Sequence, residues 1–223
     1  MCCVCLCVSR NMATAFAKPS KQVRAKLDSF VVALNKKGIK LLALDFDKTL
    51  IDIHSGGMWE ESTDKLVPHV RPCMKDLLET ASHKGLYVAI VTYHTQGWLI
   101  KELLHKVLPK KVANKIYVQA NTSDFVQRQR ASSSGSSSDG SSTVGGINRS
   151  LIVNLNGKEA HIAAVVNDIY NDHSVAIRKE EIILMDDDIN NVRIASSFGH
   201  YAFQVQQSVD YPTFESFETM LLL

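Results

Sequence analysis

Three predominantly apolar segments constrain the fold of this chain more than any other feature of its sequence. They are residues 39–46 (IKLLALDF), 86–92 (LYVAIVT) and 181–185 (EIILM). A strand that is apolar along its whole length, and not only at every second residue, is typical of a parallel sheet covered on both faces. These segments therefore predict buried strands at the centre of an α/β fold.

Segments with the apolar spacing of amphipathic helices alternate with the predicted strands. The predicted helices span residues 22–35, 72–84, 96–108, 159–170, 189–198 and 213–223, and further short strands are predicted at 115–119, 150–155 and 201–205. Strands that alternate with helices form a sheet with helices on both faces. We therefore predict a three-layer α/β/α sandwich with a central, mostly parallel, Rossmann-like sheet.

The length of 223 residues fits one domain, which we assign to residues 21–223, after a disordered tail at residues 1–20. A serine-rich segment interrupts this domain, because residues 132–142 hold eight serines, two glycines and one aspartate. Such a segment cannot bury enough apolar surface to offset its ordering entropy. We predict a flexible insertion at about residues 123–147, which is either a phosphorylatable regulatory loop or a tolerated loop expansion.

Composition and charge argue against several classes of protein. The formal net charge of +2 is too small to indicate a nucleic-acid partner, and no segment is long and apolar enough for a transmembrane helix. Four of the five cysteines lie within the first seven residues and only Cys73 lies in the body, which excludes a disulfide framework. We expect a cytoplasmic protein, with S-palmitoylation, metal binding or a weak organellar presequence as alternatives for the cysteine-rich N-terminus.

Polar side chains that could catalyse a reaction or bind a ligand follow the three apolar strands. Asp45, Thr92 and Asp187 each stand at or near the carboxyl end of one of them. Ligands of open parallel sheets bind outside the carboxyl ends of the strands. The sequence therefore predicts that these side chains converge on one site.

The segment Asp45-Phe46-Asp47-Lys48-Thr49 carries two carboxylates two residues apart at a strand end. One carboxylate can attack phosphorus and form an aspartyl-phosphate. The other can protonate the leaving oxygen and later deprotonate the attacking water. Because an anion must approach an anionic phosphate, a hard cation such as Mg²⁺ is expected as cofactor. We predict Asp45 as the nucleophile and Asp47 as the acid/base.

These residues resemble the first motif of the haloacid dehalogenase (HAD) superfamily, DxDx(T/V), and the resemblance covers about residues 38–206. It implies that Asp45 is both nucleophile and Mg²⁺ ligand, and that Asp47 also gives its backbone carbonyl to the metal. Thr49 would support the turn and is also counted among the residues expected to bind the phosphate or substrate. Members that cleave carbon–halogen bonds lack the second aspartate, so Asp47 favours phosphoryl transfer.

Two further motifs of that superfamily resemble strand ends in this chain. The second motif is matched by Thr92, whose hydroxyl would bind a phosphate oxygen, and the neighbouring Tyr93 and His94 are predicted substrate contacts. The fourth motif is matched by the segment MDDDINN. It implies Asp187 as direct metal ligand and Asp186 as its partner, with Asp188 as the alternative in a shifted register and Asn191 tying down the loop.

The third motif of the superfamily is a lysine that pairs with the nucleophile and the phosphate. Lys158, before a predicted helix, resembles it best, in the arrangement of the magnesium-dependent phosphatase branch, and Lys179 is the competitor. His54 is a further candidate for contact with substrate, whereas His69 is as compatible with an ordinary surface or core position.

The chain lacks room for a folded cap domain at either insertion point of the superfamily, so the resemblance implies a capless enzyme with an open site. We expect a phosphomonoester hydrolase acting on a phosphoprotein or a small phosphomonoester. The alternatives are a phosphotransferase on the same scaffold and a catalytically silent Mg²⁺-binding interaction module.

Overall fold

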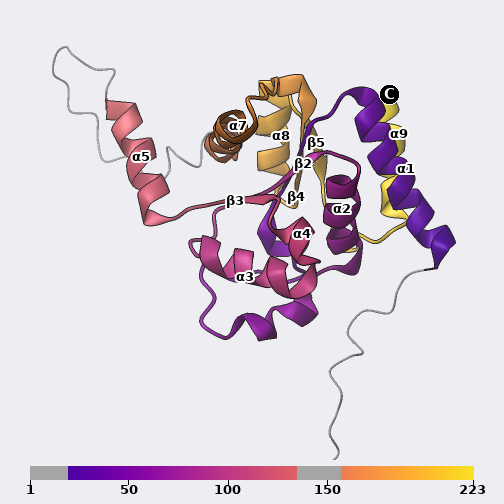
Figure 1. Cartoon of the computed structure of the whole chain (residues 1–223), viewed down its shortest axis with the longest axis horizontal. Helices are drawn as coiled ribbons and strands as arrows, with labels where there is room; N and C mark the ends of the chain where they lie inside the picture. The colour runs from indigo at the N-terminus through magenta and orange to yellow at the C-terminus, as the bar shows by residue number, and fades with distance from the viewer. Residues whose placement is uncertain (1–19, 135–156) are drawn as a thin grey trace, which may run out of the picture.

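The computed structural model describes residues 20–134 and 157–223, and this part of the chain forms a central five-stranded, wholly parallel sheet in the order β3-β2-β1-β4-β5 (Figure 1). The strands are β1 Leu41–Leu44, β2 Tyr87–Thr92, β3 Ile116–Ala120, β4 Ile182–Asp186 and β5 Tyr201–Gln204. The predicted α/β class and parallel sheet are confirmed.

Helices follow or precede each strand, as the alternating pattern predicted. They are α1 Lys21–Lys37, α2 Pro72–His83, α3 Gly97–Val107, α4 Lys110–Ala113, α5 Ser123–Ser134, α7 Glu159–His173, α8 Ile189–Phe198 and α9 Thr213–Leu222. The short α4 was not predicted. None of the helices in the described ranges is both long and apolar enough to cross a membrane.

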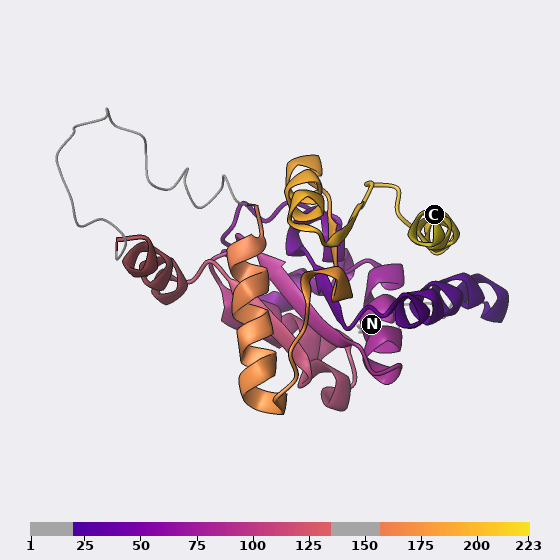
Figure 2. The same cartoon turned by 90° about the horizontal axis from the view of Figure 1, so that it is seen from above.

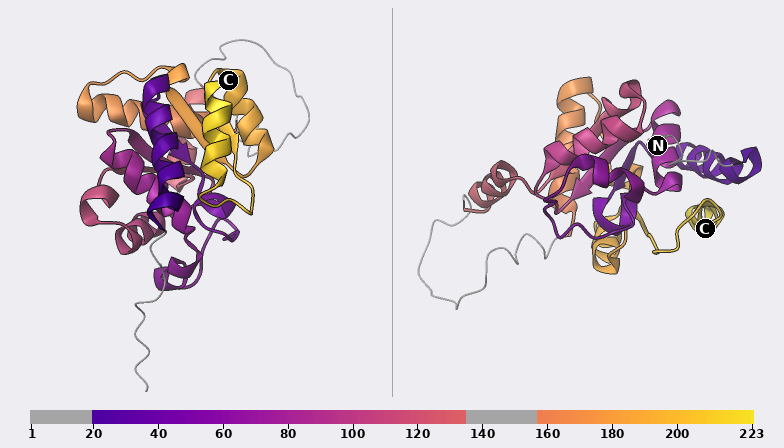
Figure 3. Two further views of the ribbon diagram at one scale, coloured as in Figure 1. Left: turned by 90° about the vertical axis from the view of Figure 1, so that its right-hand side faces the viewer. Right: turned by 90° about the horizontal axis from the view of Figure 1, so that it is seen from below.

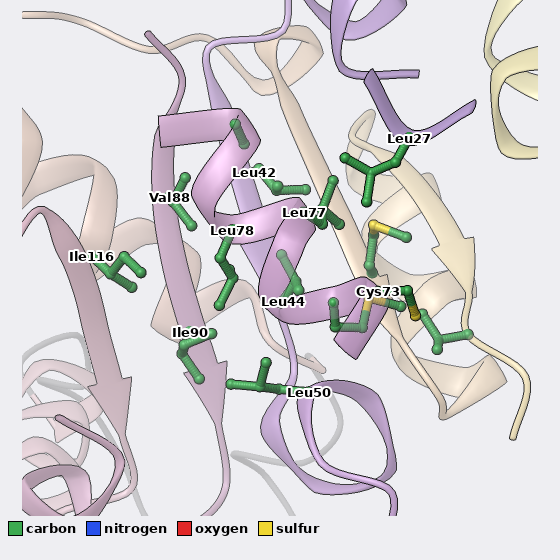
Figure 4. Packing of buried hydrophobic residues seen from close by; sticks show 14 of the residues in the cluster. Leu27, Leu42, Leu44, Leu50, Cys73, Leu77, Leu78, Val88, Ile90 and Ile116 are labelled. Carbon is green, nitrogen blue, oxygen red and sulfur yellow. The ribbon is translucent and has the colours of Figure 1, made fainter. Parts of the chain in front are cut away.

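The helices cover the sheet on both faces, which gives the predicted three layers (Figures 2 and 3). Alternation along β1 shows how: Leu42 and Leu44 belong to the cluster formed with α1, α2, α3 and α9, whereas Leu41 and Ala43 belong to the cluster with α7 and α8. Successive side chains of a strand point to opposite faces, so a strand apolar at every position feeds two cores. Figure 4 shows α2 lying across β1 and β2 in the larger cluster.

The predicted insertion at residues 123–147 differs in part from the structure. Its first half is helix α5, Ser123–Ser134. Near the start of the helix the Phe125 side chain is buried, and its ring lies 4.7 Å from the ring of His161. The remainder of the predicted insertion, the predicted strand at 150–155, and the N-terminal tail with its cysteine cluster lie outside the described residues.

The connection between β1 and α2 contains no folded cap. Its described residues form turns and two short 3₁₀ segments, Thr63–Lys65 and Val67–His69. The second insertion point extends beyond the described residues. Because β2, β1 and β4 are adjacent and parallel, their carboxyl ends meet at one edge of the sheet, and this edge carries the residues predicted to do chemistry.

Candidate active site

A tight turn after β1 carries both predicted catalytic carboxylates. The backbone N–H of Asp45 still donates to Met185 of β4 at 2.9 Å, and the chain then turns through Phe46–Leu50. Lys48 adopts a left-handed conformation with φ of 55°, which is uncommon for a side chain of this kind and typical of functional sites. Buried Arg71 supports the turn by donating from Nη2 to the Lys48 carbonyl at 3.2 Å.

A cavity of about 670 Å³ opens at this edge of the sheet. Its acidic lining residues are Asp45, Asp47, Asp186, Asp187 and Asp188, and its lysines are Lys48 and Lys158. Five carboxylates therefore face two ammonium groups, and so the cavity favours a cation. A phosphorylated substrate would need that cation to enter so acidic a cavity.

Lys158 pairs directly with the predicted nucleophile. Its Nζ lies 2.7 Å from Oδ1 of Asp45, and both side chains are buried. The ammonium also lies 4.0 Å from the centre of the Tyr93 ring, whose hydroxyl donates to the Gly157 carbonyl at 2.6 Å. Burial raises the pKa of Asp45, and Lys158 opposes that rise. Tyr93, predicted as a substrate contact, lines the cavity, and its ring packs against the Lys158 ammonium.

The two candidate lysines lie at opposite ends of the parallel sheet. Lys179 opens the 3₁₀ segment Lys179–Glu181, immediately before β4, and is exposed. It therefore lies at the amino end of the strand, opposite the edge that carries Asp45. Lys158 stands at the N-terminus of α7, and its ammonium contacts Asp45 at the carboxyl edge of the sheet. The predicted preference for Lys158 agrees with this geometry.

Asp45, Asp186 and Asp187 form a group in which one ligand atom from each side chain lies within 4.8 Å of the others. Asp186 is held by Nδ2 of Asn191 at 3.0 Å and by the backbone N–H of Asp188 at 2.9 Å. Three carboxylates with oxygen ligands suit a hard cation such as Mg²⁺. The residues present therefore fit the predicted cofactor.

Asp188 has a different role from its two neighbours. Its carboxylate accepts from the Asn190 backbone N–H at 2.8 Å and caps the N-terminus of α8. It lines the cavity but does not belong to the group of three. The alternative register, with Asp188 as a direct metal ligand, is therefore disfavoured, and the contact between Asn191 and Asp186 matches the predicted role of Asn191.

The crowding of these carboxylates leads to a pH-dependent stability. Burial, and then the charge of Asp45, raise the pKa of Asp186 from 3.8 to about 7. A carboxyl group with a raised folded-state pKa binds its proton more tightly in the folded chain. Its contribution to stability is complete below the unfolded pKa and is lost as pH rises through the folded value.

We therefore expect a specific difference between wild type and Asp186→Asn in thermal unfolding with EDTA present. From about pH 4 to about pH 7, the Tm of the wild type should fall relative to that of Asp186→Asn, which has no proton to lose there. The check is a thermal melt of both proteins across this range. Tm profiles that run parallel would contradict a raised pKa at Asp186.

Asp47 turns its carboxylate toward the loop that follows the turn. Its Oδ1 accepts from the backbone N–H of Ser55 at 3.1 Å. Its Oδ2 accepts from the Ser55 hydroxyl at 2.9 Å and lies 3.0 Å from Nδ1 of His54. Asp47 lies outside the group of three carboxylates but lines the same cavity. Its carboxylate is thus apart from the three clustered carboxylates and is held by the loop, while the predicted role of its backbone carbonyl as a metal ligand stays a prediction.

Thr92 and His94 line the cavity from the end of β2. The Thr92 oxygen accepts from the backbone N–H of His94 at 3.1 Å, so its own proton is free for another acceptor. Nδ1 of His94 accepts from the Gln96 backbone N–H at 3.1 Å, which places the proton of the neutral ring on Nε2. That nitrogen is buried without a partner among the described residues, and burial lowers the pKa of the ring.

Thr49 lies deeper than the other predicted contacts. Its side chain is wholly buried, its hydroxyl has no partner within the described parts of the chain, and it is not among the residues that line the cavity. This placement favours the predicted support of the turn over direct contact with a phosphate.

Several residues that shape the site were not predicted from the sequence. The Gly57 carbonyl accepts from the backbone N–H and the hydroxyl of Thr95, and the Gln96 side chain makes two hydrogen bonds to the Trp59 backbone. These partners are 37 or 38 residues apart. Ser55 and Arg71 were missed as well, because neither stands in a local pattern that distinguishes it from an ordinary surface residue.

Comparison with known proteins adds no further assignment. No protein-family model matches this chain, and no curated protein matches it. The chemistry of the site is therefore the basis for assigning a function.

Proposed function

We propose that this protein is a Mg²⁺-dependent phosphatase of the HAD type that hydrolyses a phosphomonoester through an aspartyl-phosphate on Asp45. One observation carries the proposal. Asp45 is buried at a strand end, lies 2.7 Å from Lys158, and shares a cluster with Asp186 and Asp187. This combination of one buried cation with three carboxylates fits a nucleophile beside a metal site better than it fits a structural ion pair.

The first chemical step follows from the positions of Asp45 and Asp47. Lys158 holds Oδ1 of Asp45, so Oδ2 is the oxygen left to attack. That oxygen bonds to phosphorus, the bond from phosphorus to the leaving oxygen breaks, and the leaving oxygen takes a proton from Asp47. The free hydroxyl proton of Thr92 donates to a phosphoryl oxygen, and Lys158 offsets the negative charge.

The second step regenerates the enzyme. Asp47 takes a proton from water, whose oxygen attacks phosphorus and displaces the Asp45 carboxylate, and inorganic phosphate leaves. Asp47 is then protonated again, as it was at the start of the cycle. Asp45, Asp186 and Asp187 would hold Mg²⁺, which supplies charge neutralisation and orientation of the phosphoryl group.

The proposal is tested by phosphate release from p-nitrophenyl phosphate, phosphopeptides, sugar phosphates and nucleotides. We expect release that EDTA abolishes and added Mg²⁺ restores. A phosphotransferase would release the alcohol without an equal amount of inorganic phosphate, and the difference would appear on an added acceptor. Mg²⁺ binding without turnover of any of these substrates would contradict the enzymatic proposal and favour a silent binding module.

A further inference from the structure

We propose that residues 53–59, here called the flap, position the carboxyl group of Asp47, and that His54 is the positioning residue that points it at the leaving oxygen. The inference rests on the proposed function, in which Asp47 is the acid/base. It adds a role for His54 and Ser55 that the predicted motifs do not contain.

The contacts of the Asp47 carboxyl group are the first support for this role of the flap. Its two carboxylate oxygens are engaged by three groups of the flap: the Ser55 N–H, the Ser55 hydroxyl and the His54 ring. Contacts to both oxygens fix the plane of a carboxyl group as well as its direction. Without them, Asp47 would be free to rotate beside the strained turn at Lys48. The flap therefore limits Asp47 to one orientation.

The second support is that hydrogen bonds attach the flap to the segment after β2. Gly57 and Trp59 are bound to Thr95 and Gln96 by four hydrogen bonds, with distances from 2.6 to 3.1 Å. Gly56 and Gly57 both have positive φ and reverse the chain between Ser55 and this anchor. The donors to Asp47 thus stand on a loop that is attached to the segment after β2, and Thr92 is the last residue of that strand.

The described segment between β1 and α2 contains no folded cap, so the flap is the part of it that can orient Asp47. A cap that closes on the substrate can orient an acid group at the moment of reaction. In the described part of this chain, the flap holds Asp47 in advance, so the acid is oriented before the substrate enters. Preorganisation of this kind matters because a small misplacement of a reacting group costs a large part of the rate.

The side-chain geometry of asparagine provides a sharp test. Nδ2 of asparagine stands at the same distance along the side chain as Nδ1 of histidine, whereas Nε2 of glutamine stands one bond farther. On an alkyl phosphomonoester, we expect His54→Asn to keep kcat within about threefold of the wild type. On the same substrate, His54→Ala and His54→Gln should lose about tenfold or more in kcat, with little change in KM. Ser55→Ala, which keeps the backbone donor, should give a smaller loss.

Leaving-group dependence separates positioning from a merely structural effect. p-Nitrophenolate leaves with little help from an acid, whereas an alkyl leaving group needs its proton. The loss in His54→Ala should therefore be large for an alkyl phosphomonoester that the wild type hydrolyses, and small for p-nitrophenyl phosphate. Thermal melts of each variant show that it is folded.

His69 provides the matched control. Its Nδ1 lies 2.9 Å from Oδ1 of Asp52, a contact of the same kind, but neither residue lines the cavity. His69→Ala should leave both rates unchanged. Full activity of His54→Ala, or an equal loss on both esters, would overturn the inference while the proposed function stands. A wild type that hydrolyses neither ester with Mg²⁺ would overturn the proposed function, and the role of His54 with it.

Discussion

Replacing Asp45 with asparagine is expected to lower Mg²⁺-dependent phosphate release by a factor of about 10⁴ or more. Asparagine has the same shape and its amide oxygen can still accept a hydrogen bond from Lys158. It cannot supply the anionic oxygen that attacks phosphorus, so no aspartyl-phosphate forms. The measurement is kcat on the best substrate of the wild type, together with acid-quench detection of the covalent phosphoenzyme.

The same substitution should not unfold the protein. Burial already disfavours the ionised form of Asp45, and its charge raises the pKa of Asp186 and Asp187. Removing that charge relieves repulsion, and Lys158 is not left unpaired because it also stabilises the charge of Asp186. With EDTA at neutral pH we therefore expect the Tm of Asp45→Asn to equal or exceed that of the wild type.

Asp52→Asn is the control for the Asp45 experiment. Asp52 is a half-exposed carboxylate on the same segment, but it does not line the cavity. It should keep wild-type activity and stability. If activity survived in Asp45→Asn, the covalent mechanism would be wrong even though the hydrolysis itself remained. A large fall in Tm would instead attribute the lost activity to the fold.

The part of the site that lies at strand ends could be predicted from the sequence. Strands β1, β2 and β4 are apolar at consecutive positions, and this pattern is strong enough to identify buried parallel strands without any tertiary information. Once the strands are parallel and adjacent, their carboxyl ends must share one edge. Asp45, Thr92 and Asp186 therefore come together for a reason that the sequence contains.

The contacts between distant segments could not be predicted in this way. Lys158 and Asp45 are 113 residues apart, and although a motif resemblance favoured Lys158 over Lys179, no local pattern shows that its ammonium contacts Asp45. Three adjacent aspartates likewise do not show which of them caps a helix, because a capping residue and a metal ligand use the same chemical group. Only the start of α8 assigns Asp188 to the cap.

The helix α5 is a second example of a contact that the local sequence did not predict. Its sequence is polar and serine-rich, and composition indicated a flexible segment. The Phe125 side chain is buried beside the His161 ring near the start of the helix, and its neighbour Val126 is partly buried. An average over the composition of the segment does not reveal a single contact of this kind.

Lys158→Met is expected to lower phosphate release by about 10² to 10³, the usual cost of removing a fixed charge that stabilises the transferring group. The ammonium is the buried counter-charge of Asp45, and its loss leaves that carboxylate without a contacting cation, although Lys48 still lines the cavity. Breaking a buried pair by removing one partner costs about 3 kcal/mol or more. We therefore expect a lower Tm at neutral pH.

The conditions that restore stability in Lys158→Met distinguish a charge effect from a packing effect. Lys158 holds down the pKa of Asp45, so without it this carboxyl group takes up a proton at a higher pH. The deficit in Tm of Lys158→Met relative to the wild type should therefore shrink as pH falls. It should also shrink when Mg²⁺ is added, because either change neutralises the carboxylates. A deficit that is unchanged by pH and by Mg²⁺ would show that Lys158 acts through packing alone.

Lys179→Met is the matched control, because Lys179 is the exposed lysine that the sequence offered as the alternative partner. It should retain the activity and the Tm of the wild type at every pH. The opposite result, with Lys179→Met inactive and Lys158→Met active, would contradict the assignment of the nucleophile's partner. The two substitutions remove the same side chain from opposite ends of the parallel sheet, so the comparison tests whether the carboxyl edge is the reactive one.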